Sequence, residues 1–178
     1  MSGPARVFLV GFMGAGKSAV GRVLAQRTGL AFVDTDAEVE KATGMAIEEI
    51  FRQRGEGAFR EAEWRALQAI ADSGPAVVAT GGGLFLGVEN RRLVRRLGRS
   101  VWLDVPLAVA AARLSARTSA LPLWSDDPLA LRALFERRRA AYALADARVD
   151  AGIGEPEVIA SVIVSNSRVF PPEFASSR

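Results

Sequence analysis

One segment of this chain, Gly11 to Ser18, constrains its fold more than any other feature. It reads Gly-Phe-Met-Gly-Ala-Gly-Lys-Ser and matches the phosphate-binding pattern G-x-x-x-x-G-K-[ST] in full. Glycines let a backbone wrap closely around phosphate oxygens, where a Cβ atom would collide. The pattern therefore predicts a buried strand, a phosphate-binding loop and a helix whose first N–H groups point at an anion.

The loop predicts a nucleotide site for ATP with Mg²⁺. Lys17 would place a compact positive charge on the β- and γ-phosphates, which makes it a candidate catalytic residue. Ser18 would offer a hydroxyl ligand to Mg²⁺. The residues expected to contact the nucleotide run through the loop into the helix: Gly14, Ala15, Gly16, Lys17, Ser18 and Ala19.

Two other interpretations of the same glycines remain open. Gly14 to Ala19 also fits the dinucleotide pattern G-x-G-x-x-A, with Asp34 or Asp36 about twenty residues further on. That pattern should open almost directly after the strand, and it has no use for the Lys-Ser pair. The other alternative is a glycine turn with a purely structural role.

Composition excludes several kinds of chemistry. The 178 residues contain no cysteine and no histidine, which rules out disulfides, thiol metal sites and histidine-based triads. The net charge is +3, and nearly all of the basic residues are arginines. Because no basic stripe with interleaved aromatic residues occurs, we expect no nucleic-acid partner. Because no apolar run reaches the length of a membrane span, we expect no membrane association either. We expect a monomer in the cytoplasm.

Strand-like and helix-like segments alternate along the chain. This order predicts an α/β fold, a three-layer sandwich with a mostly parallel five-stranded sheet, of the P-loop kinase type with a mobile lid. We expect one domain over residues 1–165, a lid at about 115–128, and a loosely ordered tail over 166–178. The expected strands are 7–10, 31–33, 75–80, 101–105 and 147–151, and the expected helices are 18–27, 37–73 with breaks at Gly44 and Gly55–Gly57, 90–97, 107–114, 129–144 and 155–164.

Four further segments, taken in order with the loop, resemble the shikimate kinase family. Each is weak alone, but their joint order and spacing are specific. They are Asp34-Thr35-Asp36, Phe59-Arg60-Glu61-Ala62-Glu63, Thr80-Gly81-Gly82-Gly83, and Glu136-Arg137-Arg138 followed by Tyr142. The resemblance implies transfer of the γ-phosphoryl group of ATP to the 3-hydroxyl of shikimate.

The resemblance also assigns roles to residues. Asp34 would hold Mg²⁺ through water, and Asp36 would bind the reacting hydroxyl and help to deprotonate it. Arg60 and Arg138 would clamp the shikimate carboxylate, as arginine's paired donors suit a planar anion. The glycine turn formed by Gly81, Gly82 and Gly83 would offer backbone N–H groups and room for the ring.

Structural roles compete with each of these assignments. Asp36 could instead cap the next helix, because aspartate is a preferred N-cap residue. Arg60 could form a surface ion pair with a neighbouring glutamate. Arg138 lies in a run of three arginines, and only its spacing to Tyr142 selects it. The glycine turn could be a turn and nothing more.

The chain departs from the family in the lid. Leu121 stands where the family has an arginine that contacts the transferring phosphate. Arg117 resembles the arginine that packs near adenine, and either it or Arg113 could be repurposed for the phosphates. A catalytically weak regulatory ligand-binding protein, or another small-molecule kinase for gluconate or nucleoside monophosphates, therefore stays an alternative.

Overall fold

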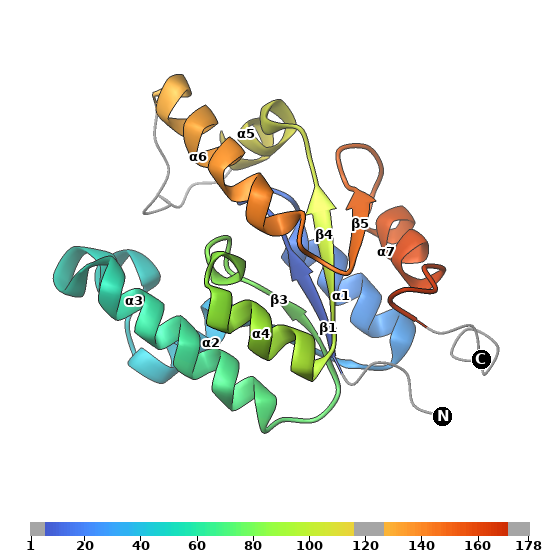
Figure 1. Cartoon of the computed structure of the whole chain (residues 1–178), viewed down its shortest axis with the longest axis horizontal. Coiled ribbons are helices and arrows are strands. Elements are labelled where there is room, and N and C mark those ends of the chain that lie inside the picture. Colours follow the sequence, from blue (N-terminus) through green and yellow to red (C-terminus); the bar gives the residue numbers. More distant parts are fainter. Residues whose placement is uncertain (1–5, 116–126, 171–178) are drawn as a thin grey trace.

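Five parallel strands form a single sheet at the centre of the molecule (Figure 1). The computed structural model describes residues 6–115 and 127–170. The sheet order is β2-β3-β1-β4-β5, and every ladder between neighbouring strands is parallel. The strands are β1 (Arg6–Val10), β2 (Ala31–Asp34), β3 (Ala76–Ala79), β4 (Arg99–Asp104) and β5 (Ala147–Asp150).

The burial of the strands explains their sequences. All residues of β1 and β3 are buried, as parallel strands covered on both faces require, and both strands are continuous apolar runs apart from Arg6. In β5, at the edge of the sheet, buried and exposed residues alternate. The predicted α/β fold with a five-stranded sheet is confirmed.

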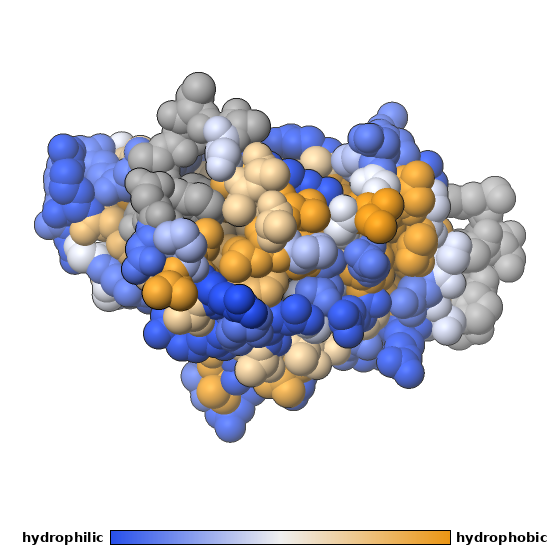
Figure 2. All heavy atoms as spheres, turned by 90° about the horizontal axis from the view of Figure 1, so that it is seen from above, coloured by the Kyte–Doolittle hydropathy of each residue, from blue (hydrophilic) through white to orange (hydrophobic). Residues whose placement is uncertain are grey.

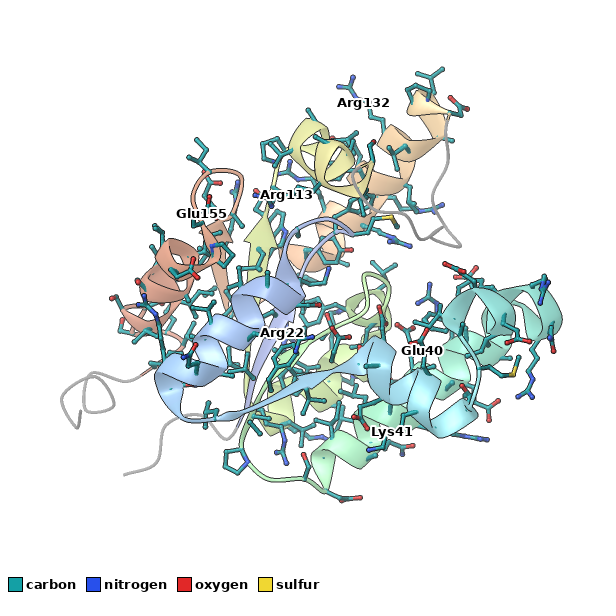
Figure 3. The ribbon with its side chains drawn as sticks, turned by 180° about the vertical axis from the view of Figure 1, so that it is seen from behind. Arg22, Glu40, Lys41, Arg113, Arg132 and Glu155 are labelled. Carbon is teal, nitrogen blue, oxygen red and sulfur yellow. The ribbon has the colours of Figure 1, made fainter. Side chains whose placement is uncertain are left out.

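Helices cover both faces of this sheet, which gives three layers (Figure 1). Helices α1 and α7 pack against each other on one face, and they lie at the front when the molecule is seen from behind (Figure 3). Helices α3 and α4 lie on the opposite face. The helices are α1 (Lys17–Thr28), α2 (Thr35–Thr43), α3 (Ile47–Ala71), the short 3-10 helix η1 (Leu84–Leu86), α4 (Val88–Leu97), α5 (Leu107–Ser115), α6 (Pro128–Tyr142) and α7 (Pro156–Val164).

Helices α2 and α3 project from one side of the sheet and pack around a small core of their own. That core contains Val39, Ile50, Phe59 and Ala66. Gly55 interrupts α3 with φ 79° and ψ 174°, so the predicted break in this long helical stretch is confirmed. The break separates a first part, whose Ile50 belongs to this small core, from a second part, whose Leu67 and Ile70 belong to the main core.

Two segments at the limits of the described residues bear on the predicted boundaries. Val169 and Phe170 are buried in the main core, so packing continues past the expected boundary at residue 165. The predicted lid lies outside the described residues apart from its two ends, and the same holds for Arg117 and Leu121. None of the helices in the described ranges has the length and apolarity needed to cross a bilayer.

Figure 2 shows the molecule from above, towards the edge at which the strands end. Hydrophilic residues form a band across this face, with hydrophobic residues on either side of it. Hydrophobic and hydrophilic residues therefore both reach the described surface in this view.

Candidate active site

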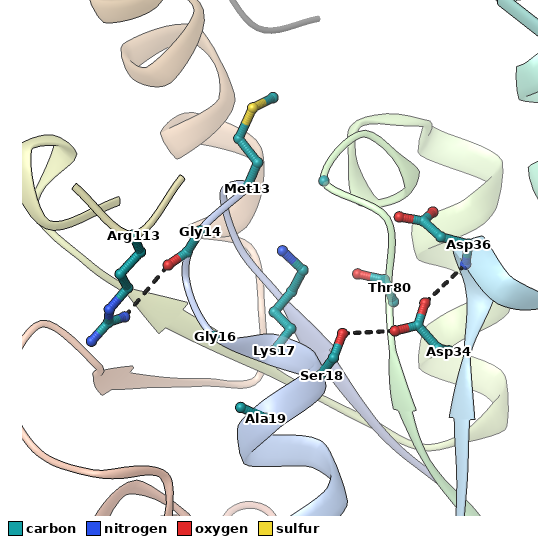
Figure 4. A pocket seen from close by; sticks show the side chains of 11 residues that line it. Met13, Gly14, Gly16, Lys17, Ser18, Ala19, Asp34, Asp36, Thr80 and Arg113 are labelled. Atoms are coloured by element: carbon teal, nitrogen blue, oxygen red, sulfur yellow. Dashed lines mark hydrogen bonds between the residues drawn. The ribbon is translucent and has the colours of Figure 1, made fainter. Parts of the chain in front are cut away.

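A pocket opens at the carboxyl ends of β1, β2 and β3 (Figure 4). Ligands of parallel α/β sheets bind at this edge, because loops from several strands meet there. The loop after β1 and the first turn of α1 form one side of the pocket. The other side is formed by Asp34 at the end of β2, by Asp36 just after it, and by Thr80 and Gly82 after β3.

The phosphate-binding loop has the backbone that its glycines allow. Gly14 and Gly16 have φ values of 77° and 87°, which residues with a Cβ atom rarely adopt. Helix α1 starts directly after Gly16, whose carbonyl accepts the N–H of Val20 at 2.9 Å. Lys17 Nζ donates to the carbonyls of Gly11 at 2.9 Å and Phe12 at 2.8 Å. The ammonium group is thus held at the mouth of the loop.

Ser18 and Asp34 bring two oxygen ligands together beside the loop. The Ser18 hydroxyl donates to Asp34 Oδ2 at 2.7 Å, and Asp34 Oδ1 accepts the backbone N–H of Asp36 at 3.1 Å. Asp34 is the N-cap residue of α2. The capping role that we considered for Asp36 therefore belongs to Asp34, and the Asp36 side chain is left for the pocket.

Asp36 lies against the glycine turn after β3. A Cβ atom on Gly81 would lie 2.5 Å from Asp36 Oδ1 and 2.8 Å from Glu63 Oε1, so only glycine fits between these two carboxylates. Both oxygens are buried, and neither has a hydrogen-bond partner among the described residues. Burial, reinforced by the charge of Asp34, raises the pKa of Asp36 to about 6.

Arg60 reaches the same turn from α3. A Cβ atom on Gly83 would collide with the Arg60 guanidinium. Arg60 Nη1 donates to Glu63 Oε2 at 2.5 Å, and Nη2 donates to Glu56 at 2.9 Å. The ion pair that we considered as an alternative is therefore present, but Glu63 is fully buried. This buried partner holds the guanidinium over the glycine turn.

Arg138 is the member of the arginine run that faces the site. Its side chain is 2% exposed, and its Nη1 would lie 3.3 Å from a Cβ atom on Gly82. Arg139 points away and contacts Asp104 at 3.3 Å, whereas Arg137 is exposed. Burial lowers the pKa of Arg138, because removal from water disfavours the charged form.

Sequence comparison identifies the family to which this arrangement belongs. The family model described as shikimate kinase matches residues 13–168. The shikimate kinase of Ruegeria pomeroyi is 48% identical over 141 residues, which cover 79% of this chain and 72% of the relative. The chain belongs to the shikimate kinase family. The shikimate kinase of Persephonella marina is 40% identical over 162 residues, which cover 91% of this chain and 98% of the relative.

The fold agrees with solved structures of the same family. The structure of shikimate kinase from Acinetobacter baumannii in complex with shikimate superposes with a TM-score of 0.85 at 33% identity. The match covers 90% of each chain. Family membership at this level establishes an ATP-dependent kinase and excludes the dinucleotide-binding interpretation of the loop.

The structure brings most of the predicted shikimate kinase residues to one place. Asp36, Arg60 and Arg138 come from α2, α3 and α6, and their functional groups surround the turn Gly81 to Gly83. Gly82 also lines the pocket of the phosphate-binding loop. The predicted phosphate and substrate groups are therefore continuous in space, although their roles in binding stay predictions.

Three residues at this site were not assigned a role from the sequence. Glu63 holds Arg60, and its position one turn after Arg60 on a helix is a signal that could have found it. Thr35 is fully buried and accepts the backbone N–H of Gly81 through Oγ1 at 2.8 Å. Tyr142, which served only to select Arg138, donates to the Gly82 carbonyl at 2.5 Å.

Arg113 lies on the other side of the phosphate-binding loop from Lys17 (Figure 4). Its guanidinium donates to the carbonyls of Gly14 at 3.4 Å and Ala151 at 3.2 Å. It also lines a second pocket, beside Glu155 at the start of α7 (Figure 3). Ala15, Gly16 and Ala19 reach this second pocket as well. Arg113 is thus a nucleotide-site candidate in the described part of the chain, whereas Arg117 lies outside it.

Proposed function

We propose that the chain transfers the γ-phosphoryl group of ATP to the 3-hydroxyl of shikimate, giving shikimate 3-phosphate and ADP. The observation that carries this proposal is the turn Gly81 to Gly83. Two arginines and two carboxylates converge on it, one of the carboxylates being the Arg60 partner Glu63, and its middle residue also lines the phosphate pocket. A carboxylic acid that carries hydroxyl groups matches this combination of charges.

The two arginines suit the carboxylate of the substrate. Arg60 and Arg138 approach the turn from different helices, and Arg138 is buried with its Nε unpaired. A guanidinium offers paired N–H donors in the geometry of a carboxylate. Binding an anion would therefore satisfy a buried donor of Arg138 that has no hydrogen-bond partner among the described residues.

Asp36 suits the reacting hydroxyl. Its buried oxygen without a partner can accept the hydroxyl proton as the substrate oxygen forms a bond to the γ-phosphorus. The bond between that phosphorus and the bridging oxygen of ADP then breaks, and the electron pair leaves with ADP. Lys17 would stabilise the charge on the phosphate oxygens during this step, because phosphoryl transfer depends on positioning and electrostatics.

The residues present also fit Mg²⁺. Ser18 Oγ and Asp34 Oδ2 are hard oxygen ligands 2.7 Å apart beside the loop. No cluster of three acidic residues in the described ranges could hold the ion alone, so phosphate oxygens and water would complete its shell. We propose that Ser18 holds the ion directly and Asp34 through water, and that the ion neutralises phosphate charge when bound.

The adenosine end of ATP would occupy the second pocket. That pocket begins at the loop, continues along Ala19 and Val20 of α1, and ends at Pro156 and Ile159 of α7. Apolar walls of this kind suit a purine ring, and the Arg113 guanidinium could stack on its face. Action as a monomer and in the cytoplasm, without nucleic acid or membrane, remains a prediction.

The test is release of ADP by the purified chain with Mg²⁺ and one acceptor at a time. Shikimate, gluconate, nucleoside monophosphates and no acceptor are assayed in parallel. We expect turnover that depends on shikimate alone. Nucleotide binding without turnover on any acceptor would contradict the proposal and favour a regulatory protein.

A further inference from the structure

We propose that Tyr142 is a positioning residue that fixes Arg138 and the Gly82–Gly83 peptide in one geometry for the substrate carboxylate. This inference rests on the proposed function and adds a residue to it. Tyr142 is the last residue of α6, one helical turn after Arg138. Both side chains therefore lie on the same face of the helix and point at the glycine turn.

The phenol oxygen of Tyr142 is shared between two groups of the site. It donates its proton to the Gly82 carbonyl at 2.5 Å. A phenol has one O–H donor and two acceptor lone pairs, so the oxygen can serve Arg138 only as an acceptor. The Arg138 guanidinium interacts electrostatically with this oxygen, and we infer that one of its Nη–H groups donates to it. One edge of the guanidinium is thus held, and other donors stay available for an anion.

The same contact orients the backbone of the turn. In a trans peptide, the C=O and the following N–H point in opposite directions. Because Tyr142 holds the Gly82 carbonyl, the N–H of Gly83 points away from Tyr142. Arg138 lies beside the same peptide, since its Nη1 would lie 3.3 Å from a Cβ atom on Gly82. The position of Arg138 and the direction of the Gly83 N–H are therefore coupled.

The surroundings keep the tyrosine ring in place and its hydroxyl protonated. Tyr142 is 1% exposed, and its ring packs on Trp102 with centroids 6.3 Å apart. Burial raises the pKa of Tyr142 to about 12. Arg138 also contacts the Phe12 ring at 5.7 Å, but that contact does not set the rotation of the guanidinium in its plane. Tyr142 supplies this constraint.

Tyr142→Phe tests the inference, because it removes only the hydroxyl. We expect the KM for shikimate to rise about ten- to a hundredfold, since a hydrogen bond to a charged group is lost. The KM for ATP should stay within about twofold. In an Arg138→Ala background, the same substitution should add little, because Tyr142 acts through Arg138. Ile163→Ala is the control: it removes buried apolar atoms from α7 and should lower the melting temperature without changing the KM for shikimate.

Several outcomes would overturn the inference. These are an unchanged shikimate KM in Tyr142→Phe, an equal rise for shikimate and ATP, or a full additional loss in the Arg138→Ala background. All three presuppose a wild type with shikimate-dependent turnover, whose absence would contradict the proposed function itself. The two failures are therefore distinguishable.

A second measurement does not depend on how well Tyr142→Phe folds. The chain has a single tyrosine, so growth on 3-fluorotyrosine labels this position alone and keeps the hydroxyl. We expect its one ¹⁹F resonance to shift when shikimate binds, and the shift to be lost in Arg138→Ala. A resonance that saturating shikimate leaves unchanged in the wild type would also overturn the inference.

Discussion

The Ser18 hydroxyl donates a hydrogen bond of 2.7 Å to Asp34 Oδ2, which joins the first turn of α1 to the end of β2. The other oxygen of Asp34 caps α2 through the N–H of Asp36. One carboxylate therefore connects the phosphate-binding loop to the helix that carries the proposed base. Asp34 thus combines a proposed role in binding Mg²⁺ with a structural role as the N-cap of α2. Substitutions of Asp34 can separate these two roles.

Asp34→Asn should separate the two roles, because asparagine caps helices about as well as aspartate. We expect the Mg²⁺ concentration for half-maximal activity to rise about tenfold or more, with the melting temperature nearly unchanged. Asp34→Ala should lose both roles and cost about 1 kcal/mol of stability as well. Activity titrated against Mg²⁺, together with thermal unfolding, measures the difference. An unaltered Mg²⁺ requirement in Asp34→Asn would contradict the metal assignment.

Lys17→Ala should lower kcat/KM by about a hundred- to a thousandfold or more, since it removes a preorganised charge from the transferring phosphate. The matched control is Lys41→Ala, because Lys41 is the only other lysine and is exposed on α2. Steady-state ADP release measures both variants. Near-normal turnover in Lys17→Ala would show that the loop does not act as proposed.

Asp36 should impose a pH dependence on the reaction. Its pKa is raised to about 6, first by burial and then by the charge of Asp34. The carboxylate that accepts a proton is the ionised form, so kcat/KM should fall as pH drops through about 6. Asp36→Asn should lose about a hundred- to ten-thousandfold in rate and lack this titration. A wild-type profile that stays flat from pH 5 to 8 would contradict the assignment.

Asp36 should also affect stability in the opposite direction to most carboxylates. A raised pKa means that the folded state binds the proton more tightly than the unfolded state does. The contribution of Asp36 to the free energy of unfolding is therefore greatest below its ordinary pKa and is lost as pH rises through about 6. Asp36→Asn should melt at a higher temperature than the wild type at pH 8, and this difference should disappear at pH 4.

Arg60→Ala should raise the KM for shikimate about tenfold or more and leave the KM for ATP nearly unchanged. Arg65→Ala is the control, because Arg65 lies on the same helix and forms an exposed ion pair with Glu61 at 2.5 Å. Such exposed pairs contribute little. Equal losses for both substrates in Arg60→Ala would argue against a carboxylate clamp.

Sequence patterns predicted those structural features that depend only on residues close together in the chain. The apolar run of β1, the phosphate-binding loop and the break at Gly55 all follow from residue type and spacing within a few positions. The Arg60–Glu63 pair belongs to the same class, because its two members are neighbours on one helix face.

Contacts across the sheet could not be predicted in this way. Thr35 accepts the N–H of Gly81, and Tyr142 donates to Gly82. Both contacts depend on β3 lying between β2 and β1, although β3 comes after both in the sequence. The strand order cannot be predicted from the residue types at positions 35 and 142. Burial also decided between Arg138 and its arginine neighbours, and burial depends on how α6 packs.

Leu121 leads to a prediction about which cation stabilises the transferring phosphoryl group. The family's lid arginine is absent from the sequence there, and in the described residues Lys17 and Arg113 are the cations that line the phosphate pocket. Arg113 lies across the loop from Lys17 (Figure 4), on the side of the proposed adenosine pocket. If residue 121 contacts the transferring phosphate, as the family resemblance implies, an arginine there would add a third cation to these two.

Leu121→Arg should accordingly raise kcat at least about tenfold, with a smaller effect on the KM for shikimate, because developing charge is stabilised mainly in the transition state. Leu129→Arg is the matched control: it adds the same charge on α6 at a side chain that is 79% exposed, and should leave kcat unchanged. A wild type that is already fast and gains nothing from Leu121→Arg would show that another arginine supplies the charge. Arg117→Ala and Arg113→Ala would then identify it, since only the variant that loses that cation should lose kcat without a matching rise in the KM for ATP.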